Sequence, residues 1–211
     1  MSDDAQIGSM PALKEWAVIC HALLAGEQIV DVRKGGIRED ARTDDDGRTR
    51  RTFGLPAARC WLYPTAEHQR AELLKEPYRH WIDLAPAAPV GEPITIHGWA
   101  EIVEVATLTE PEHLTALDAK LIWTHDYAES RLRWRARDPL WVLVLRAHQL
   151  ADPLVVPWDD EYGGCTSWVP LADLPSPDVL ASQPALSDVA FEARLKGVRE
   201  SLPDGALAPP A

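Results

Sequence analysis

The stretch PLWVLVLRAHQL, residues 139–150, decides the fold of this 211-residue chain. From Leu140 to Leu145 every side chain is apolar, and most are aliphatic. A continuous apolar run of this length, bounded by a proline, is typical of a strand that is buried in the middle of a sheet. We therefore expect residues 139–150 to form the central strand.

The rest of the chain predicts a mixture of short strands and helices in no strict alternation. Expected strands lie at 28–33, at 59–63 up to Pro64, at 92–108 as two strands or one strand bent at Gly98, and after the glycines of YGGCTSWV. Expected helices lie at 11–25, from Thr65 to Pro77, at 111–121, from Thr124 to Arg131, and after Ser187. This mixture favours an α+β fold, with a curled, mainly antiparallel sheet or a small β-barrel flanked by helices.

A length of 211 residues fits one domain with appendages. We expect a disordered leader at 1–10, one domain at 11–171, a Pro/Ala-rich linker at 172–185, a C-terminal helix at 186–203 and a disordered tail at 204–211. Inside the domain, residues 39–52 are expected to form a mobile loop. From Glu39 to Arg51 it has no apolar side chain larger than alanine.

Composition excludes some classes of protein. A formal net charge of -12 argues against a protein that coats duplex nucleic acid, because such binding needs many cationic contacts to phosphates. No run of about 18 apolar residues is present, so we expect a cytoplasmic protein without a membrane partner. Cys20, Cys60 and Cys165 show no metal-binding spacing, and we expect reduced thiols, no metal and no cofactor.

Cations nevertheless gather in part of the chain. Residues 31–79 contain 11 Lys/Arg against 9 Asp/Glu, a net charge of +2. In RKGGIRE, the backbone amides of Gly35 and Gly36 can face an anion, with Arg33 and Lys34 supplying positive charge. The alternative is a hairpin turn with solvated charges, since Gly-Gly is an ordinary two-residue connection.

A second candidate site is WLYPTAEHQ, residues 61–69. A strand ending at Tyr63 would deliver a helix N-terminus at Thr65, with His68 and Gln69 in its first turn. Free amides, a hydroxyl and an imidazole would then face a polar or anionic ligand. The alternative is a well-capped helix in which His68 is merely exposed.

A third candidate is RLRWRAR, residues 131–137, in which Arg131 could bind phosphate while Trp134 stacks on a base. Its alternative is a solvated face.

Trp168 is expected to line a cleft because it follows the glycines of YGGCTSW. Cys165 is read as a structural thiol rather than a nucleophile, and the acids 159–161 as a solvated loop.

Several of these segments resemble one family. LKEW (13–16), LLAGEQIVDVRKGGIRE (23–39), WLYPTAEHQ (61–69), WAEI (99–102) and YGGCTSW (162–168) are similar to the bacterial family called domain of unknown function 1802. The resemblance implies no activity, since the family has none established. Some members are joined to a restriction-endonuclease-like domain, which implies a link to restriction or DNA defence.

LLAGEQIVDVR also resembles the helix-then-strand opening of ASCH domains. This resemblance implies a PUA-like β-barrel whose cleft binds a nucleotide or a modified base. Gln28 stands where such domains commonly carry lysine, and Ile29 where they carry threonine, so their amidohydrolase chemistry is not carried over.

The leading hypothesis is a binding domain for an anionic ligand: a nucleotide, a modified base or single-stranded nucleic acid. The expected ligand-binding residues are Arg33, Lys34, Gly35, Gly36, Tyr63, Thr65, His68, Gln69, Arg131, Trp134 and Trp168. The alternative is a small hydrolase in which His68, Lys34, Glu39 or Glu67 transfers protons, with Glu15 or Glu39 beside His68. A protein-interaction module is the third hypothesis, with no partner indicated by the sequence.

Overall fold

The computed structural model describes residues 10–34, 41–43, 49–51, 54–85, 87–134, 138–171 and 173–210. Residues 1–9 of the expected leader and much of the expected loop at 39–52 lie outside these ranges.

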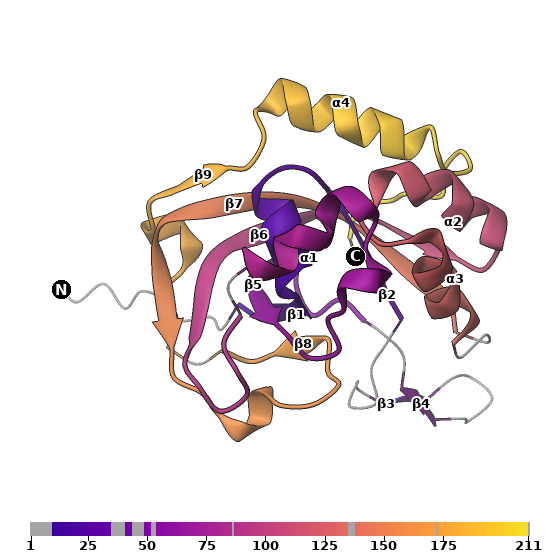
Figure 1. Cartoon of the computed structure of the whole chain (residues 1–211). Helices are drawn as coiled ribbons and strands as arrows, with labels where there is room; N and C mark the ends of the chain where they lie inside the picture. The colour runs from indigo at the N-terminus through magenta and orange to yellow at the C-terminus, as the bar shows by residue number, and fades with distance from the viewer. Residues whose placement is uncertain are drawn as a thin grey trace.

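One sheet organises the described chain (Figure 1). Its strands follow the order β2-β7-β6-β5-β1-β8, and β9 also pairs with β7. Their bounds are β1 Ala12–Trp16, β2 Val30–Arg33, β5 Arg59–Thr65, β6 Ile94–Leu108, β7 Leu140–Val156, β8 Trp168–Val169 and β9 Ser182–Pro184. Among these strands β1 and β5 run parallel, and the other pairs are antiparallel. The fold is α+β with a mainly antiparallel, open sheet.

The expected central strand is confirmed. β7 pairs with β6 along one edge, and with β2 and then β9 along the other. Leu140, Val142, Leu143, Val144 and Leu145 are all fully buried, because strands flank them on both edges and side chains cover both faces. β3 (Ala41–Thr43) and β4 (Thr49–Arg51) form a separate hairpin.

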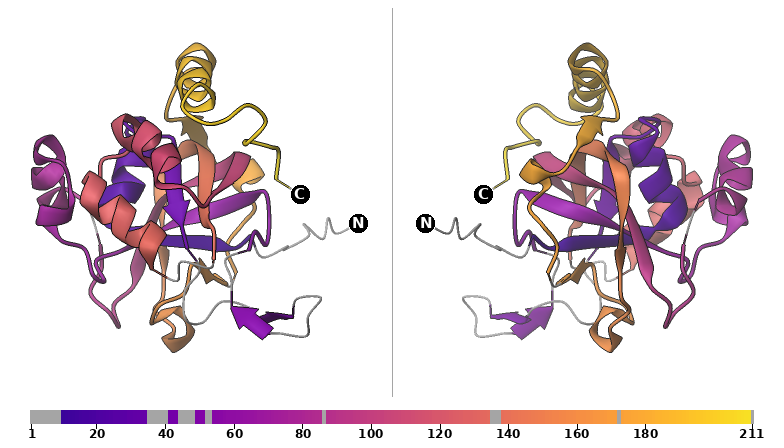
Figure 2. Two further views of the ribbon diagram at one scale, coloured as in Figure 1. Left: turned by 90° about the vertical axis from the view of Figure 1, so that its right-hand side faces the viewer. Right: turned by 90° about the vertical axis from the view of Figure 1, so that its left-hand side faces the viewer.

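The helices flank the sheet (Figures 1 and 2). They are α1 Ala17–Leu24, α2 Pro111–Leu117, α3 His125–Arg133 and α4 Asp188–Arg199, with 3-10 turns η1 Ala71–Leu73, η2 Glu76–Asp83, η3 Asp118–Lys120, η4 Asp160–Tyr162 and η5 Pro177–Val179. Two of the three expected N-caps are confirmed: Thr124 accepts from the Tyr127 amide and Ser187 from the Ala190 amide. Within the expected linker, η5 and β9 are ordered and β9 joins the sheet.

The expectation of a helix at 11–25 was partly wrong. LKEW belongs to β1, and the helix begins only at Ala17. β1 pairs with β5 on one side and β8 on the other, so its backbone donors and acceptors are satisfied by distant strands. This pairing outweighs the local helical spacing of Leu13, Trp16 and Cys20.

The expectation of a helix from Thr65 was also wrong. β5 continues through Pro64 to Thr65, opposite Glu15 and Trp16 of β1. The hydroxyl of Thr65 accepts from the Glu67 amide at 3.1 Å, which closes a turn instead of capping a helix. His68 then takes a left-handed backbone conformation, with φ of 63°, that no right-handed helix contains.

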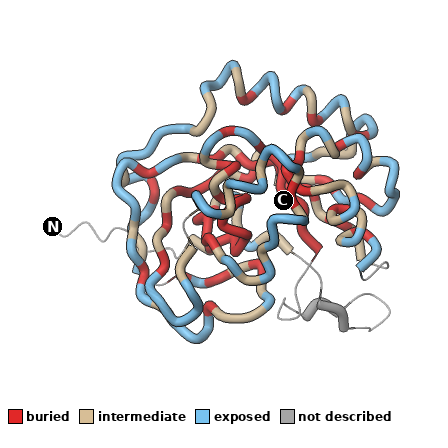
Figure 3. The backbone as a smooth tube through the Cα atoms, in the orientation of Figure 1, coloured by how far each residue is buried: buried red, intermediate tan, exposed pale blue. Residues whose placement is uncertain are grey.

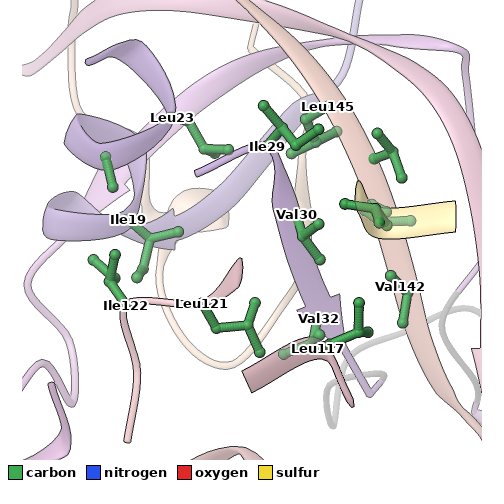
Figure 4. Close-up of a cluster of buried hydrophobic side chains, with 14 of the residues drawn as sticks. Ile19, Leu23, Ile29, Val30, Val32, Leu117, Leu121, Ile122, Val142 and Leu145 are labelled. Carbon is green, nitrogen blue, oxygen red and sulfur yellow. The ribbon is translucent and has the colours of Figure 1, made fainter. Parts of the chain in front are cut away.

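The main core lies between α1, the β2 end of the sheet and the helices α2 to α4. Ile19 and Leu23 of α1 point toward Val30 of β2 and Leu145 of β7 in the close-up (Figure 4). The tube coloured by burial shows this interior in red, whereas α4 exposes one side along its length (Figure 3). Packing in this core fixes the position of α1 on the sheet. It thereby also fixes the position of the residues that immediately precede the helix.

Gly98 is required where α1 crosses β6. A Cβ on Gly98 would lie 2.3 Å from the carbonyl oxygen of His148 and 2.4 Å from Leu24 Cδ2. We expect Gly98→Ala to lower the free energy of unfolding by about 1–3 kcal/mol, measured by urea denaturation.

Gly197→Ala is the matched control. Its nearest neighbour is the flexible Lys120 ammonium at 3.0 Å and it lies in α4, so a stabilisation of about 0.5–1 kcal/mol is expected. Equal effects of the two changes would contradict the tight crossing.

Candidate ligand pocket

A pocket of about 210 Å³, here called the β1 pocket, opens at the C-terminal ends of β1 and β5. Residues from five parts of the chain line it: β1, β2, the turn after β5, α3 with its flanks, and the loop before β8. They are Lys14, Glu15, Trp16, Val32, Arg33, Thr65, Glu67, His68, Trp123, Tyr127, Arg131, Trp134, Gly164, Cys165, Thr166 and Ser167. Residues as far apart in the sequence as Lys14 and Ser167 therefore meet at one place.

The floor of the β1 pocket contains a buried ion pair. Arg33 donates to Glu15 Oε2, and both side chains are less than a tenth exposed. The other carboxylate oxygen of Glu15 accepts from the Trp16 amide at 2.6 Å. Both oxygens of Glu15 are thus occupied, so this carboxylate is held in place and neutralised by Arg33.

A second ion pair fixes one wall. The Lys14 ammonium donates to Glu67 at 2.5 Å and to the carbonyl oxygens of Tyr162 and Gly164 at 3.0 Å each. Its three donors are all used, so Lys14 anchors the loop 163–167 to β1. Gly164, with φ of 82°, supplies the left-handed residue that this turn requires.

Aromatic rings form the opposite wall. Trp16 and Tyr127 stack with ring centroids 5.1 Å apart, and Trp123 lies 6.2 Å from Tyr127. Trp134, at the C-terminal end of α3, is 41% exposed, which leaves ring surface available to a ligand. Such a wall suits a flat aromatic ligand.

Arg131 supplies positive charge at this wall. Its guanidinium lies 6.0 Å from the Trp134 ring centroid. Within the described ranges no carboxylate pairs with Arg131, in contrast to Lys14 and Arg33. Arg131 can therefore give its hydrogen bonds to an anionic ligand.

His68 lies at the exposed edge of the pocket in its left-handed conformation. Such a backbone costs about 1–3 kcal/mol in a residue other than glycine, and it is commonest at functional sites. In the described structure no hydrogen bond joins His68 to Glu15. Of the two acids that the hydrolase hypothesis places beside His68, Glu15 is thus engaged with Arg33 instead, and Glu39 lies outside the described residues.

Asp31 lies under the floor and is completely buried. Its Oδ1 accepts from the Val32 amide, while Oδ2 has no hydrogen-bond partner among the described residues. Burial, followed by repulsion from Glu15, raises the pKa of Asp31 from its ordinary value to about 8, against the opposing effect of Arg33. At neutral pH Asp31 is therefore mainly protonated.

Of the predicted site residues, the structure brings Arg33, Thr65, His68, Arg131 and Trp134 together in the β1 pocket. Glu67 and Glu15 of the hydrolase hypothesis also line it.

The other predicted site residues lie elsewhere. Lys34 is buried and donates to the carbonyl oxygen of Leu132, so it fastens the end of α3. Tyr63 is buried against Tyr162 in a second core cluster, and the side chain of Gln69 accepts from the Val18 amide at the start of α1. The Trp168 indole donates to the carbonyl oxygen of Gly54 at 2.7 Å. Gly35, Gly36 and Glu39 lie outside the described residues.

Sequence reasoning missed Lys14, Trp16 and Tyr127 as pocket residues. The first two were assigned to a helix, where their neighbours would be three and four residues away. The signal that could have found them is the LKEW segment itself, which carries two charges between apolar residues. Buried as a strand, such charges need partners from elsewhere in the chain.

In the described part of the chain no group of three or more His, Cys, Asp or Glu side chains is arranged to hold a metal ion. All three cysteines are free: Cys20 and Cys60 are buried, and Cys165 is exposed at the pocket. The acids at 159–161 start η4, where Asp159 accepts from the Glu161 amide. No described helix has the length and apolar character needed to cross a membrane.

Comparison with known proteins gives one match. The family model described as "Domain of unknown function (DUF1802)" matches residues 12–197. No curated protein and no solved structure matches the chain.

Proposed function

We propose a ligand-binding function for this chain, which belongs to the DUF1802 family, a domain of unknown function. The ligand is a nucleotide or a modified base, bound in the β1 pocket. The observation that carries this proposal is the pairing of an aromatic wall with Arg131, a cation that no described carboxylate neutralises.

The size of the pocket supports a ligand with one ring system. Its 210 Å³ lies below the range of about 300–1,000 Å³ that is usual for drug-sized ligands. The base of a single nucleotide fits such a volume, with the phosphate of the nucleotide toward solvent and Arg131. A base extruded from single-stranded nucleic acid would enter in the same way.

The charges around the pocket support selectivity for one anionic group. Lys14 and Arg33 are neutralised by Glu67 and Glu15, so the wall and floor carry little net charge. An anion bound by Arg131 would therefore keep most of the attraction of that arginine. Proteins that coat nucleic acid need many such cations, which the net charge of -12 does not provide.

Binding is tested by calorimetric titration of the protein with the four nucleoside monophosphates, the matching nucleosides, and a short single-stranded oligonucleotide at low salt. For the monophosphate that binds, Arg131→Gln is expected to weaken affinity about tenfold or more, because a hydrogen bond to a charged group contributes about 1.5–3 kcal/mol. Affinity for the corresponding nucleoside should change little.

Arg133→Gln is the matched control for this test. Arg133 lies on the same helix and carries the same charge, but it pairs with Glu129 at 2.5 Å and does not line the pocket. Its loss should weaken binding by less than about twofold at moderate salt. Equal weakening by both changes, or no binding by any of the three ligand types, would refute the site. Binding of the oligonucleotide alone would assign the pocket to single-stranded nucleic acid.

A hydrolase is the second candidate function, and the strained backbone of His68 at the pocket edge favours it. The proposed likeness to ASCH domains does not supply its chemistry. At the position where those domains commonly carry lysine, Gln28 is buried and accepts from the Ile122 amide at 2.9 Å. Release of product from the bound ligand, lost in His68→Gln while binding persists, would support catalysis.

The link to restriction or DNA defence is part of the same proposal. It rests on the family resemblance and would be supported if a nucleoside monophosphate with a modified base, added to this titration, bound more tightly than its unmodified counterpart.

A further inference from the structure

A second cavity, of about 370 Å³ and here called the α1 pocket, is lined in part by α1. It shares no lining residue with the β1 pocket. Its residues come from α1, β5, the end of η2, β6 and β7, and they are Ala17, Cys20, His21, Leu24, Ala25, Leu62, Pro64, Leu84, His97 and Gln149.

Most of this lining is aliphatic. Leu24, Leu62 and Leu84, together with two alanines and Pro64, form walls that favour an apolar ligand. Leu84 is 62% exposed although it is a large apolar residue, which marks it as part of the open rim. Among the described residues, no Asp, Glu, Lys or Arg side chain lines the cavity.

Two imidazoles are the ionisable groups in these walls apart from the thiol of Cys20. His21 projects from α1, with its ring edge-to-face against Trp81 at 5.0 Å. His97 lies where the pairing of β6 with β7 changes register, between Ile96 and Gly98. Such irregularities redirect side chains and are frequent beside binding sites.

Among the described residues, no carboxylate balances the charge of either imidazole. Burial lowers the pKa of His21, and burial followed by the nearby His21 lowers that of His97. No carboxylate raises either value, whereas Glu101 acts on the neighbouring His148. Within the described chain neither His21 nor His97 has a hydrogen-bond partner for its ring. The thiol of Cys20 is held neutral by burial, and Gln149 is uncharged.

We propose that the α1 pocket binds a small apolar carboxylate, such as an aromatic or short aliphatic acid. The aliphatic walls take its tail, and His21 and His97 bind the carboxylate, at least one of them as imidazolium. The ligand supplies the negative charge that the walls lack, so binding is coupled to uptake of a proton.

The probe is benzoate, with benzamide as a neutral analogue of the same shape, titrated calorimetrically at about pH 6 and about pH 8. Benzoate is ionised at both values, so a change in its affinity reports the protein. Above the pKa of an imidazole, each further pH unit lowers its protonated fraction by up to tenfold. Benzoate should therefore bind at least tenfold more tightly at the lower pH. Benzamide should bind weakly and without this dependence.

The double variant His21→Gln with His97→Gln is expected to abolish most of the pH dependence, because it removes both imidazoles from the cavity. His113→Gln is the control, because His113 lies on α2 outside the α1 pocket. A thermal melt of each variant shows whether it is folded.

A measurement on the unmodified protein avoids reliance on the variants. Nuclear magnetic resonance titration of the histidine ring protons should show the pKa of His21 or His97 rising when benzoate is saturating. If benzoate and benzamide bind equally and without pH dependence, the cavity binds apolar groups but does not recognise a carboxylate. That result would overturn the proposal. Absence of benzoate binding at both pH values would overturn it as well.

Discussion

Replacing Arg33 by methionine is expected to lower the free energy of unfolding by about 3–5 kcal/mol, the cost of removing one partner from a buried ion pair. Glu15 would then remain as a carboxylate less than a tenth exposed, beside the buried Asp31. Methionine keeps much of the length and apolar contact of the arginine stem. The loss therefore reports charge rather than volume, and urea denaturation at neutral pH measures it.

The double variant Glu15→Gln with Arg33→Met distinguishes an effect of the unpaired charge from an effect of lost packing. Removing both charges leaves no unpaired carboxylate, so the double variant should be more stable than Arg33→Met alone. Arg199→Met is the matched control, since Arg199 pairs with Glu104 at the surface and its loss should be much smaller. If the double variant is no more stable than Arg33→Met, loss of packing would account for the effect and the charge argument would fail.

The same ion pair explains which parts of the fold could be predicted from sequence. β7 was predictable because its apolar run is continuous, and burial on both faces follows from the residues themselves. β1 was not, because Lys14 and Glu15 appear solvated in the sequence. Their burial depends on Glu67, 53 residues from Lys14, and on Arg33, 18 residues from Glu15. Partners at such distances leave no local pattern.

The candidate site divides in the same way. Arg131 and Trp134 lie three residues apart in RLRWRAR, a segment whose composition allowed either a ligand site or a solvated face, and both residues line the β1 pocket. Lys34 was chosen for its charge, yet its ammonium is used to hold the Leu132 carbonyl oxygen. A residue type indicates which groups a side chain can bind. The fold decides whether its hydrogen bonds go to a ligand or to the protein backbone.

The contribution of Asp31 to the stability of the protein is expected to fall as pH rises from about 4 to about 8. The pKa of Asp31 is raised from 3.8 to about 8 by burial first and then by Glu15. Between these values the folded chain keeps a proton that the unfolded chain has released. Unfolding then releases a proton, so the free energy of unfolding decreases by up to about 1.4 kcal/mol per pH unit.

Asp31→Asn removes this titration while keeping an oxygen that can accept from the Val32 amide. The variant should therefore be more stable than the unmodified protein near pH 8, with its advantage shrinking toward pH 5. Urea denaturation at both values gives the two differences. Asp152→Asn is the control for the same chemical change at the surface: Asp152 is exposed on β7, so its replacement should change stability by less than about 0.5 kcal/mol. An Asp31→Asn difference that is independent of pH would mean that Asp31 is ionised in the folded chain, and that Arg33 balances two carboxylates rather than Glu15 alone.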